Sequence, residues 1–82
     1  MDKSAYQVTI ENSIITAETL CNDYEECTFI NCDFAELNLA EVAFSDCSFS
    51  GCNLTNVKIK HTALKKAIFN DCKLMGIQFT DA

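Results

Sequence analysis

The sequence predicts an all-β solenoid, in which the chain bends at short intervals and winds around a central apolar core. The first observation is that a large apolar residue recurs at every fifth position from Tyr24 to Phe79. The second is a smaller, mostly apolar series two positions earlier in each repeat, which includes five of the six cysteines. The third is that the chain contains no proline and only two glycines, so it must bend by some other device.

A period of five excludes both regular elements as the main structure. On an α-helix, five residues advance by about 500°, so successive repeats would scatter their apolar residues around the helix. On a continuous strand, an odd period places successive apolar residues on opposite faces. Because the pattern persists for twelve repeats, we expect a conformation that points every repeat inward and stacks coil on coil.

The repeats resemble a known family. Cys-Asp-Phe-Ala-Glu at 32–36, Leu-Asn-Leu-Ala-Glu at 37–41 and Cys-Asn-Leu-Thr-Asn at 52–56 resemble pentapeptide repeats, whose usual form is A-(D/N)-L-X-X. The resemblance implies a right-handed quadrilateral β-helix with four repeats per coil, and hence about three coils in residues 21–82. Residues 1–20, where Ile10, Ile15 and Leu20 are spaced by five but one register away, are predicted to be a lead-in or N-terminal cap.

Four repeats per coil place residues twenty positions apart in one column of the core. The predicted core then has four columns, one of them entirely phenylalanine. The columns are Phe29, Phe49 and Phe69; Phe34, Leu54 and Leu74; Tyr24, Phe44 and Leu64; and Leu39, Ile59 and Phe79. In the smaller series, Cys32, Cys52 and Cys72 share one column, and Cys27 and Cys47 share another.

The cysteines are interpreted as small buried residues. Their C-x₄-C spacing follows the period of the fold and puts neighbouring thiols on different sides of a coil, whereas a zinc site needs them to converge. Stacking at about 4.8 Å is also wider than the Cβ separation that a disulfide prefers. Residues 1–10 show no apolar run typical of a signal peptide or membrane span, so reduced thiols and a cytoplasmic location are expected. Cys21 lies off the repeat phase and has no assigned role.

Charge is divided unevenly along the chain, whose net charge is −6. Residues 1–57 contain ten acidic side chains against one lysine, a net charge of −9, while residues 58–82 contain five lysines against two aspartates, a net charge of +3. The acidic balance argues against direct binding of nucleic acid or of an anionic membrane surface. Acidic residues at outward positions of the repeats are predicted to form a partner-binding surface: Glu25, Glu26, Asp33, Glu36, Glu41 and Asp46.

No residue pattern indicates catalysis. The sequence lacks a glycine-rich phosphate loop, a nucleophile elbow and a zinc signature. His61, the only histidine, falls at an outward position two residues after Ile59 and is interpreted as an exposed surface residue. The sequence therefore predicts a protein that is not an enzyme and needs no cofactor or metal.

Among pentapeptide-repeat proteins, the runs at 27–34 (Cys-Thr-Phe-Ile-Asn-Cys-Asp-Phe) and 45–49 (Ser-Asp-Cys-Ser-Phe) most resemble the N-terminal half of the Qnr and MfpA type. That resemblance implies a dimeric rod that mimics duplex DNA, binds DNA gyrase or topoisomerase IV and protects them from quinolones. The chain departs from the Qnr pattern in its few coils, its basic second half and its lack of loop insertions and of a C-terminal helix. The alternatives are a fragment of a longer rod, a homodimer formed through the open C-terminal end, and a general interaction module without topoisomerase activity.

Overall fold

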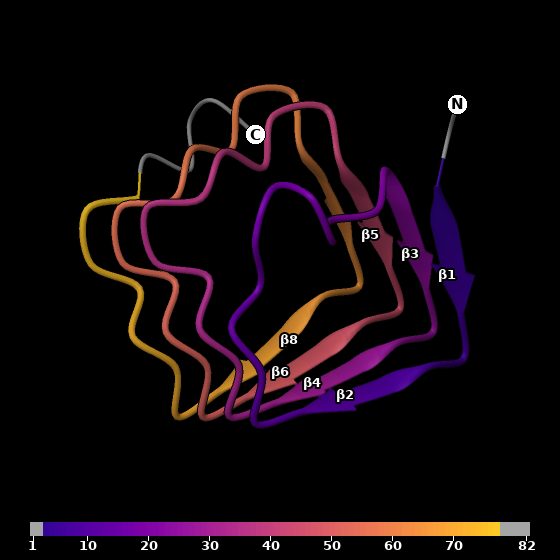
Figure 1. Cartoon of the computed structure of the whole chain (residues 1–82), viewed down its shortest axis with the longest axis horizontal. Coiled ribbons are helices and arrows are strands. Elements are labelled where there is room, and N and C mark those ends of the chain that lie inside the picture. The colour runs from indigo at the N-terminus through magenta and orange to yellow at the C-terminus, as the bar shows by residue number, and fades with distance from the viewer. Residues whose placement is uncertain (1–2, 78–82) are drawn as a thin grey trace.

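The computed structural model describes residues 3–77, which wind into a β-solenoid with a nearly square cross-section (Figure 1). Its strands lie in two parallel four-stranded sheets, with the orders β1-β3-β5-β7 and β2-β4-β6-β8. The strands are β1 (Ser4–Tyr6), β2 (Thr9–Glu11), β3 (Asp23–Glu25), β4 (Thr28–Ile30), β5 (Ala43–Ser45), β6 (Ser48–Ser50), β7 (Ala63–Lys65) and β8 (Ile68–Asn70). The predicted all-β solenoid is confirmed.

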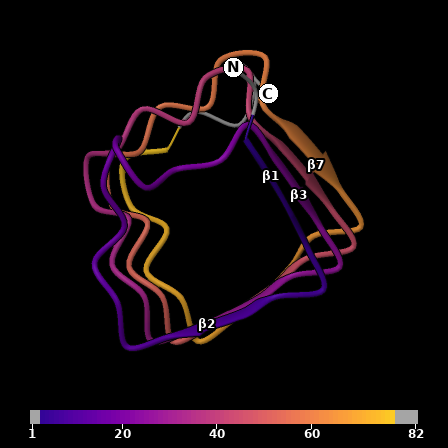
Figure 2. The same ribbon diagram turned by 45° about the vertical axis from the view of Figure 1, so that its right-hand side comes forward.

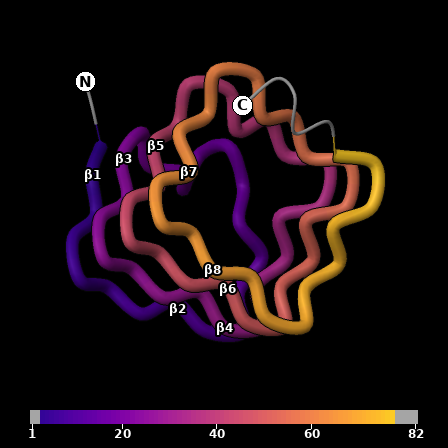
Figure 3. Tube along the Cα trace, turned by 180° about the vertical axis from the view of Figure 1, so that it is seen from behind, coloured from indigo at the N-terminus to yellow at the C-terminus, as the bar shows by residue number. Residues whose placement is uncertain are grey.

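The two sheets form neighbouring sides of the square, and Figure 2 shows the strands of each sheet stacked along the solenoid axis. In Figure 1 the chain runs clockwise and recedes from the viewer, and the last coil lies in front when the solenoid is seen from behind (Figure 3), so the winding is right-handed. Isolated parallel bridges, such as Asp33 with Asn53 and Asn38 with Lys58, join the coils on the other two sides. Within residues 3–77 no helix is long and apolar enough to cross a membrane.

The length of each coil follows from the strand register. Tyr24 pairs with Phe44 and Phe44 with Leu64, so these coils contain twenty residues, as four five-residue repeats require. Ala5, however, pairs with Tyr24, which makes the first coil nineteen residues long. The missing residue explains why the apolar spacing of the N-terminal segment lies one register away from the later phase.

Residues 3–20 occupy the first level of the solenoid. β1 and β2 extend the two sheets by one strand each, and the inward Ala5, Ile10, Ile15 and Leu20 pack against the buried core. A short turn closes this level, with the Leu20 N–H donating to the Thr16 carbonyl at 3.0 Å. The division of the chain after residue 20 stays a prediction.

Aromatic stacks run through the centre of the core. The rings of Phe29 and Phe49 lie 4.9 Å apart with planes 9° from parallel, and Phe49 stacks on Phe69 at the same distance. Tyr24 and Phe44 stack on the neighbouring side at 5.1 Å. These stacks follow the columns expected from a twenty-residue coil. Phe79, assigned to the fourth column, lies outside the described residues.

The bending device is a left-handed residue at the corners of the square. Within residues 3–77, eleven non-glycine residues have positive φ, among them Glu26 at 54°, Asp46 at 55° and Lys66 at 57°, and each follows an inward residue by two positions. This conformation is unfavourable for residues with a Cβ. At the corners it directs the backbone N–H along the axis, so that the Glu26 N–H donates to the Ser45 carbonyl of the next coil at 2.8 Å. The ladder of such bonds offsets the local strain.

Candidate functional site

The six acidic residues predicted to form a partner surface do not share one face. Glu25, Glu26 and Asp46 lie together where the first sheet turns into the second, at the ends of β3 and β5. Glu36 and Glu41 occupy two other corners, with φ of 59° and 63°. The six are, in chain order, Glu25, Glu26, Asp33, Glu36, Glu41 and Asp46. We call Glu25, Glu26 and Asp46 the acidic corner.

The acidic corner is held by the backbone ladder. Glu26 and Asp46 stand in one column, one coil or about 4.8 Å apart, because the Glu26 N–H donates to the Ser45 carbonyl and the Asp46 N–H to the Lys65 carbonyl, both at 2.8 Å. All three acidic side chains are exposed. The neighbouring Glu26 carboxylate raises the pKa of Tyr6, whose side chain is also exposed. The corner therefore presents a fixed, solvated cluster of negative charge.

Asp33 has a structural role. Its Oδ1 accepts the Ala35 backbone N–H at 2.9 Å, just as Asn38 Oδ1 accepts the Ala40 N–H at 3.0 Å in the following repeat. Such side-chain-to-backbone bonds stabilise turns, and asparagine serves equally well. Asp33 thus belongs to the turn and not to the acidic corner.

Asp23 is an acidic residue that the sequence prediction left out. It begins β3, is exposed, and shares an outward face with Glu25 on the other side of the inward Tyr24. The alternation of side chains along a strand would have identified it. The exposed outward surface of β3 therefore carries two carboxylates.

Four of the six cysteines are buried, namely Cys27, Cys32, Cys47 and Cys52, and their thiols bond to backbone carbonyls of the preceding coil. The Cys47 Sγ donates to the Tyr24 carbonyl and the Cys52 Sγ to the Phe29 carbonyl, both at 3.4 Å. Burial raises the pKa of both thiols, that of Cys52 to about 11. Cys21 is half-buried, and its backbone N–H donates to the Tyr24 hydroxyl at 2.8 Å. Residues 3–77 contain no group of three or more His, Cys, Asp or Glu side chains that could hold a metal ion.

The comparison with protein families agrees with this geometry. The model described as a pentapeptide repeat region matches residues 22–82. The chain belongs to the pentapeptide-repeat family. No relative matches it among the curated proteins.

Solved structures place this pentapeptide-repeat protein beside QnrB1. Full-length QnrB1, described as a plasmid-mediated fluoroquinolone resistance protein, matches with a TM-score of 0.62 and 29% identity, over 84% of this chain and 33% of QnrB1. A trypsin-treated QnrB1 variant matches with a TM-score of 0.54 and 29% identity, over 82% of this chain and 33% of that one. The predicted resemblance to the Qnr type is confirmed, and the chain spans about a third of the length of the structures it matches.

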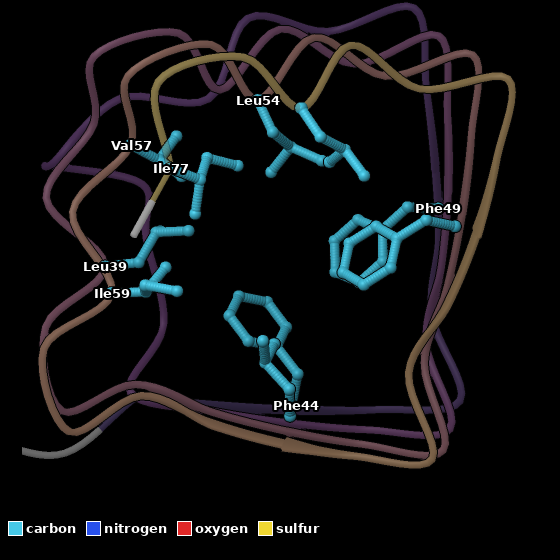
Figure 4. Close-up of a pocket in the computed structure, with 10 residues that line it drawn as sticks. Leu39, Phe44, Phe49, Leu54, Val57, Ile59 and Ile77 are labelled. Atoms are coloured by element: carbon cyan, nitrogen blue, oxygen red, sulfur yellow. The ribbon is translucent and has the colours of Figure 1, made fainter. Parts of the chain in front are cut away.

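A small apolar cavity lies in the core of the pentapeptide-repeat protein, towards the last coil (Figure 4). Its volume is about 20 Å³, which is room for about one water molecule. Figure 4 shows aliphatic side chains such as Leu54, Ile59 and Ile77 on one part of its wall and Phe44 and Phe49 on another. Organic ligands need several hundred Å³ and a few polar groups, so this cavity is a packing gap and not a ligand site.

The buried thiols predict a pH dependence for the pentapeptide-repeat protein. The pKa of Cys52 is raised from 9.0 to about 11, so its neutral form is favoured in the folded chain. The stabilisation is complete below about pH 9 and is lost as the pH rises through the folded pKa, because unfolded thiols release protons first. Urea unfolding at intervals from about pH 8 to about pH 11 should show a falling free energy of unfolding. The double variant Cys47→Ala/Cys52→Ala should show a shallower fall, and an equally steep one would contradict the assignment.

Proposed function

We propose that the chain is a non-catalytic binding module whose acidic corner occupies the DNA-binding surface of a type II topoisomerase, DNA gyrase or topoisomerase IV. The observation that carries the proposal is the column of Glu26 and Asp46, with Glu25 beside it, on a fold similar to that of QnrB1. QnrB1 is described as a fluoroquinolone resistance protein. Fluoroquinolones act on type II topoisomerases, so the target of these drugs suggests the partner of the chain. Such a partner implies a cytoplasmic location.

The spacing of the acidic corner supports mimicry of a phosphate backbone. The column carries one carboxylate per coil, or one per about 4.8 Å, and a DNA strand carries one phosphate per about 3.4 Å. Because the corner residues are fixed by backbone hydrogen bonds, little backbone entropy is lost when a partner binds. A basic groove that binds DNA would thus meet preorganised negative charges.

The same column also limits the contact. Gln7 lies one coil before Glu26 and Lys66 one coil after Asp46, so the acidic stretch covers two coils only. The chain also spans about a third of QnrB1. We therefore expect weaker protection than a full-length relative would give.

A supercoiling assay with gyrase and ciprofloxacin tests the proposal. The parent chain should restore supercoiling in the presence of drug, or inhibit it in the absence of drug, in a concentration-dependent manner. The variant Glu25→Lys/Glu26→Lys/Asp46→Lys should need at least about tenfold more protein, because each lysine would face a basic groove. The fold should survive, since Lys66 already adopts the same left-handed conformation in this column.

The control is Glu36→Lys/Glu41→Lys, which reverses two charges at corners outside the cluster, against three in the acidic-corner variant, and should retain most of the activity. If the parent chain has no effect on supercoiling with or without drug, the topoisomerase proposal is wrong. If both variants lose activity equally, net charge and not the acidic corner is responsible.

A general protein-interaction module is the second candidate function. It is favoured by the exposed lysines of the last part of the chain, including Lys60, Lys65 and Lys73, which interrupt the acidic surface. A partner captured equally well by the parent and by the acidic-corner variant would support this candidate. The homodimer through the C-terminal end stays a prediction.

A further inference from the structure

Charge changes sign along the solenoid axis. Residues 21–40 contain five acidic side chains and no basic one, a net charge of −5. Residues 3–20 contain Lys3 against Glu11 and Glu18, a net charge of −1, whereas residues 61–77 contain three lysines against Asp71, a net charge of +2. The lysines of this last coil are all exposed. One end of the solenoid is therefore negative and the other positive.

The two ends also expose complementary backbone edges. At every internal level, a corner N–H donates to the coil that follows, as Asp46 does to the Lys65 carbonyl at 2.8 Å. The next strand donates to the coil that precedes it, as Ser48 does to the Cys27 carbonyl at 3.0 Å. By the same rule, the edge of β7 and β8 presents the Lys66 N–H, and the edge of β1 and β2 presents the Tyr6 carbonyl. The hydrogen bonds of a parallel ladder run in a fixed pattern from coil to coil. The edge of β7 and β8 can therefore continue the ladder only onto the edge of β1 and β2 of another copy.

The apolar interior is half-covered at both ends. Leu64, Phe69 and Leu74 are partly buried at the last level, and their counterparts in the same columns at the first level are Ala5, Ile10 and Ile15. Stacking the first level of one copy on the last level of another would set small or branched side chains over large ones. That arrangement would bury apolar surface on both sides, and unpaired sheet edges commonly pair with another chain.

We propose that the chain binds a second copy of itself head to tail, with residues 61–77 of one copy stacked on residues 3–20 of the next. In this stack Lys65 lies in the column of Tyr6 and Glu25, two coils or about 10 Å from the Glu25 carboxylate. This separation exceeds the screening length of about 8 Å at physiological salt, so the attraction between the ends is weakened there and becomes stronger at low salt. The interface is heterologous and leaves a free end on each copy, so assembly is open-ended.

A symmetric contact between two C-terminal ends is the competing arrangement. It would bring two coils of net charge +2 together and place lysines near lysines. It would also set identical edges against each other, which cannot continue a parallel ladder. Such a dimer would stop at two copies and would be strengthened by removing the lysines.

Sedimentation velocity over a range of protein and salt concentrations distinguishes the two arrangements. For the head-to-tail stack, the mass should grow beyond a dimer with rising concentration, and the apparent affinity should fall by about tenfold or more between low and high salt. The variants Lys65→Glu/Lys66→Glu and Glu25→Lys/Glu26→Lys should each associate more weakly than the parent. Lys58→Glu/Lys60→Glu changes the charge by the same amount one side of the square earlier in the chain, so it is the matched control and should have a smaller effect.

Mixing the two variants is the decisive measurement. An acidic C-terminal end of one variant then faces a basic N-terminal end of the other, so the mixture should regain association that neither shows alone. Circular dichroism should show that each variant keeps the β-solenoid. A parent that stays monomeric at all concentrations, a species that stops at a dimer, or a mixture that fails to associate would each overturn the proposal.

Discussion

Replacing Phe49 with alanine is expected to destabilise the chain by about 3–5 kcal/mol, enough to unfold most of it at room temperature. Phe49 is 1% exposed and sits between Phe29 and Phe69, with ring centroids 4.9 Å away on each side. It also meets the edges of Phe34 and Phe44 at 5.8 and 5.4 Å. Alanine would leave a cavity that the rigid backbone ladder cannot close. Thermal and urea unfolding followed by circular dichroism measure the loss.

Two further variants separate the stack from simple apolar burial. Phe49→Leu keeps most of the volume and should cost less than about 1.5 kcal/mol. Phe69→Ala removes a ring that is only partly buried and stacks on one neighbour, so it should cost clearly less than Phe49→Ala. Cooperative unfolding of Phe49→Ala near the parent's midpoint would show that the central position of Phe49 in the core is wrong.

The core was predictable because the pattern that encodes it is regular. A period of five fixed which residues point inward, and four repeats per coil fixed which of them stack, so the contacts of Phe49 follow from the sequence once the coil length is known. The nineteen-residue first coil was not predictable in the same way. Its inward Ala5 is small and Thr9 falls on the later phase, so the apolar signal there is too weak to fix a register.

The candidate site was predictable only in part. Outward positions follow from the same period, which is why the three residues of the acidic corner are among the six acidic residues that the sequence predicts. The period does not show what a carboxylate binds, and Asp33 is held by the Ala35 N–H of its own turn. It also gives no sign that the corner residues are left-handed, because Glu26, Glu36 and Glu41 have no preference for positive φ that would reveal it.

Replacing Gly51 with valine is also expected to destabilise the chain strongly, because Gly51 is a left-handed corner residue. Gly51 has a φ of 62°, and its N–H donates to the Asn70 carbonyl at 2.9 Å, so the backbone cannot relax without breaking the ladder. A β-branched residue in this conformation is strained by about 1–3 kcal/mol. A Cβ at this position would lie 2.5 Å from the Asn31 Oδ1, but this atom is the far end of a side chain that can move aside, so the backbone strain is the main cost. Urea unfolding should show a loss of about 2–3 kcal/mol in total.

The matched substitution is Gly51→Asn. Both variants add a Cβ at this corner, so the difference between them measures the cost of placing a β-branched residue in the left-handed conformation. Asparagine already occupies the same corner at Asn12 and Asn31, where φ is 51° and 52°, and the Asn31 Nδ2 donates to the Asn12 Oδ1 at 3.3 Å. Because asparagine tolerates the left-handed region and can extend this side-chain ladder, we expect a change within about 1 kcal/mol. Equal stability of the valine and asparagine variants would mean that this corner is not left-handed and that the chain bends there in some other way.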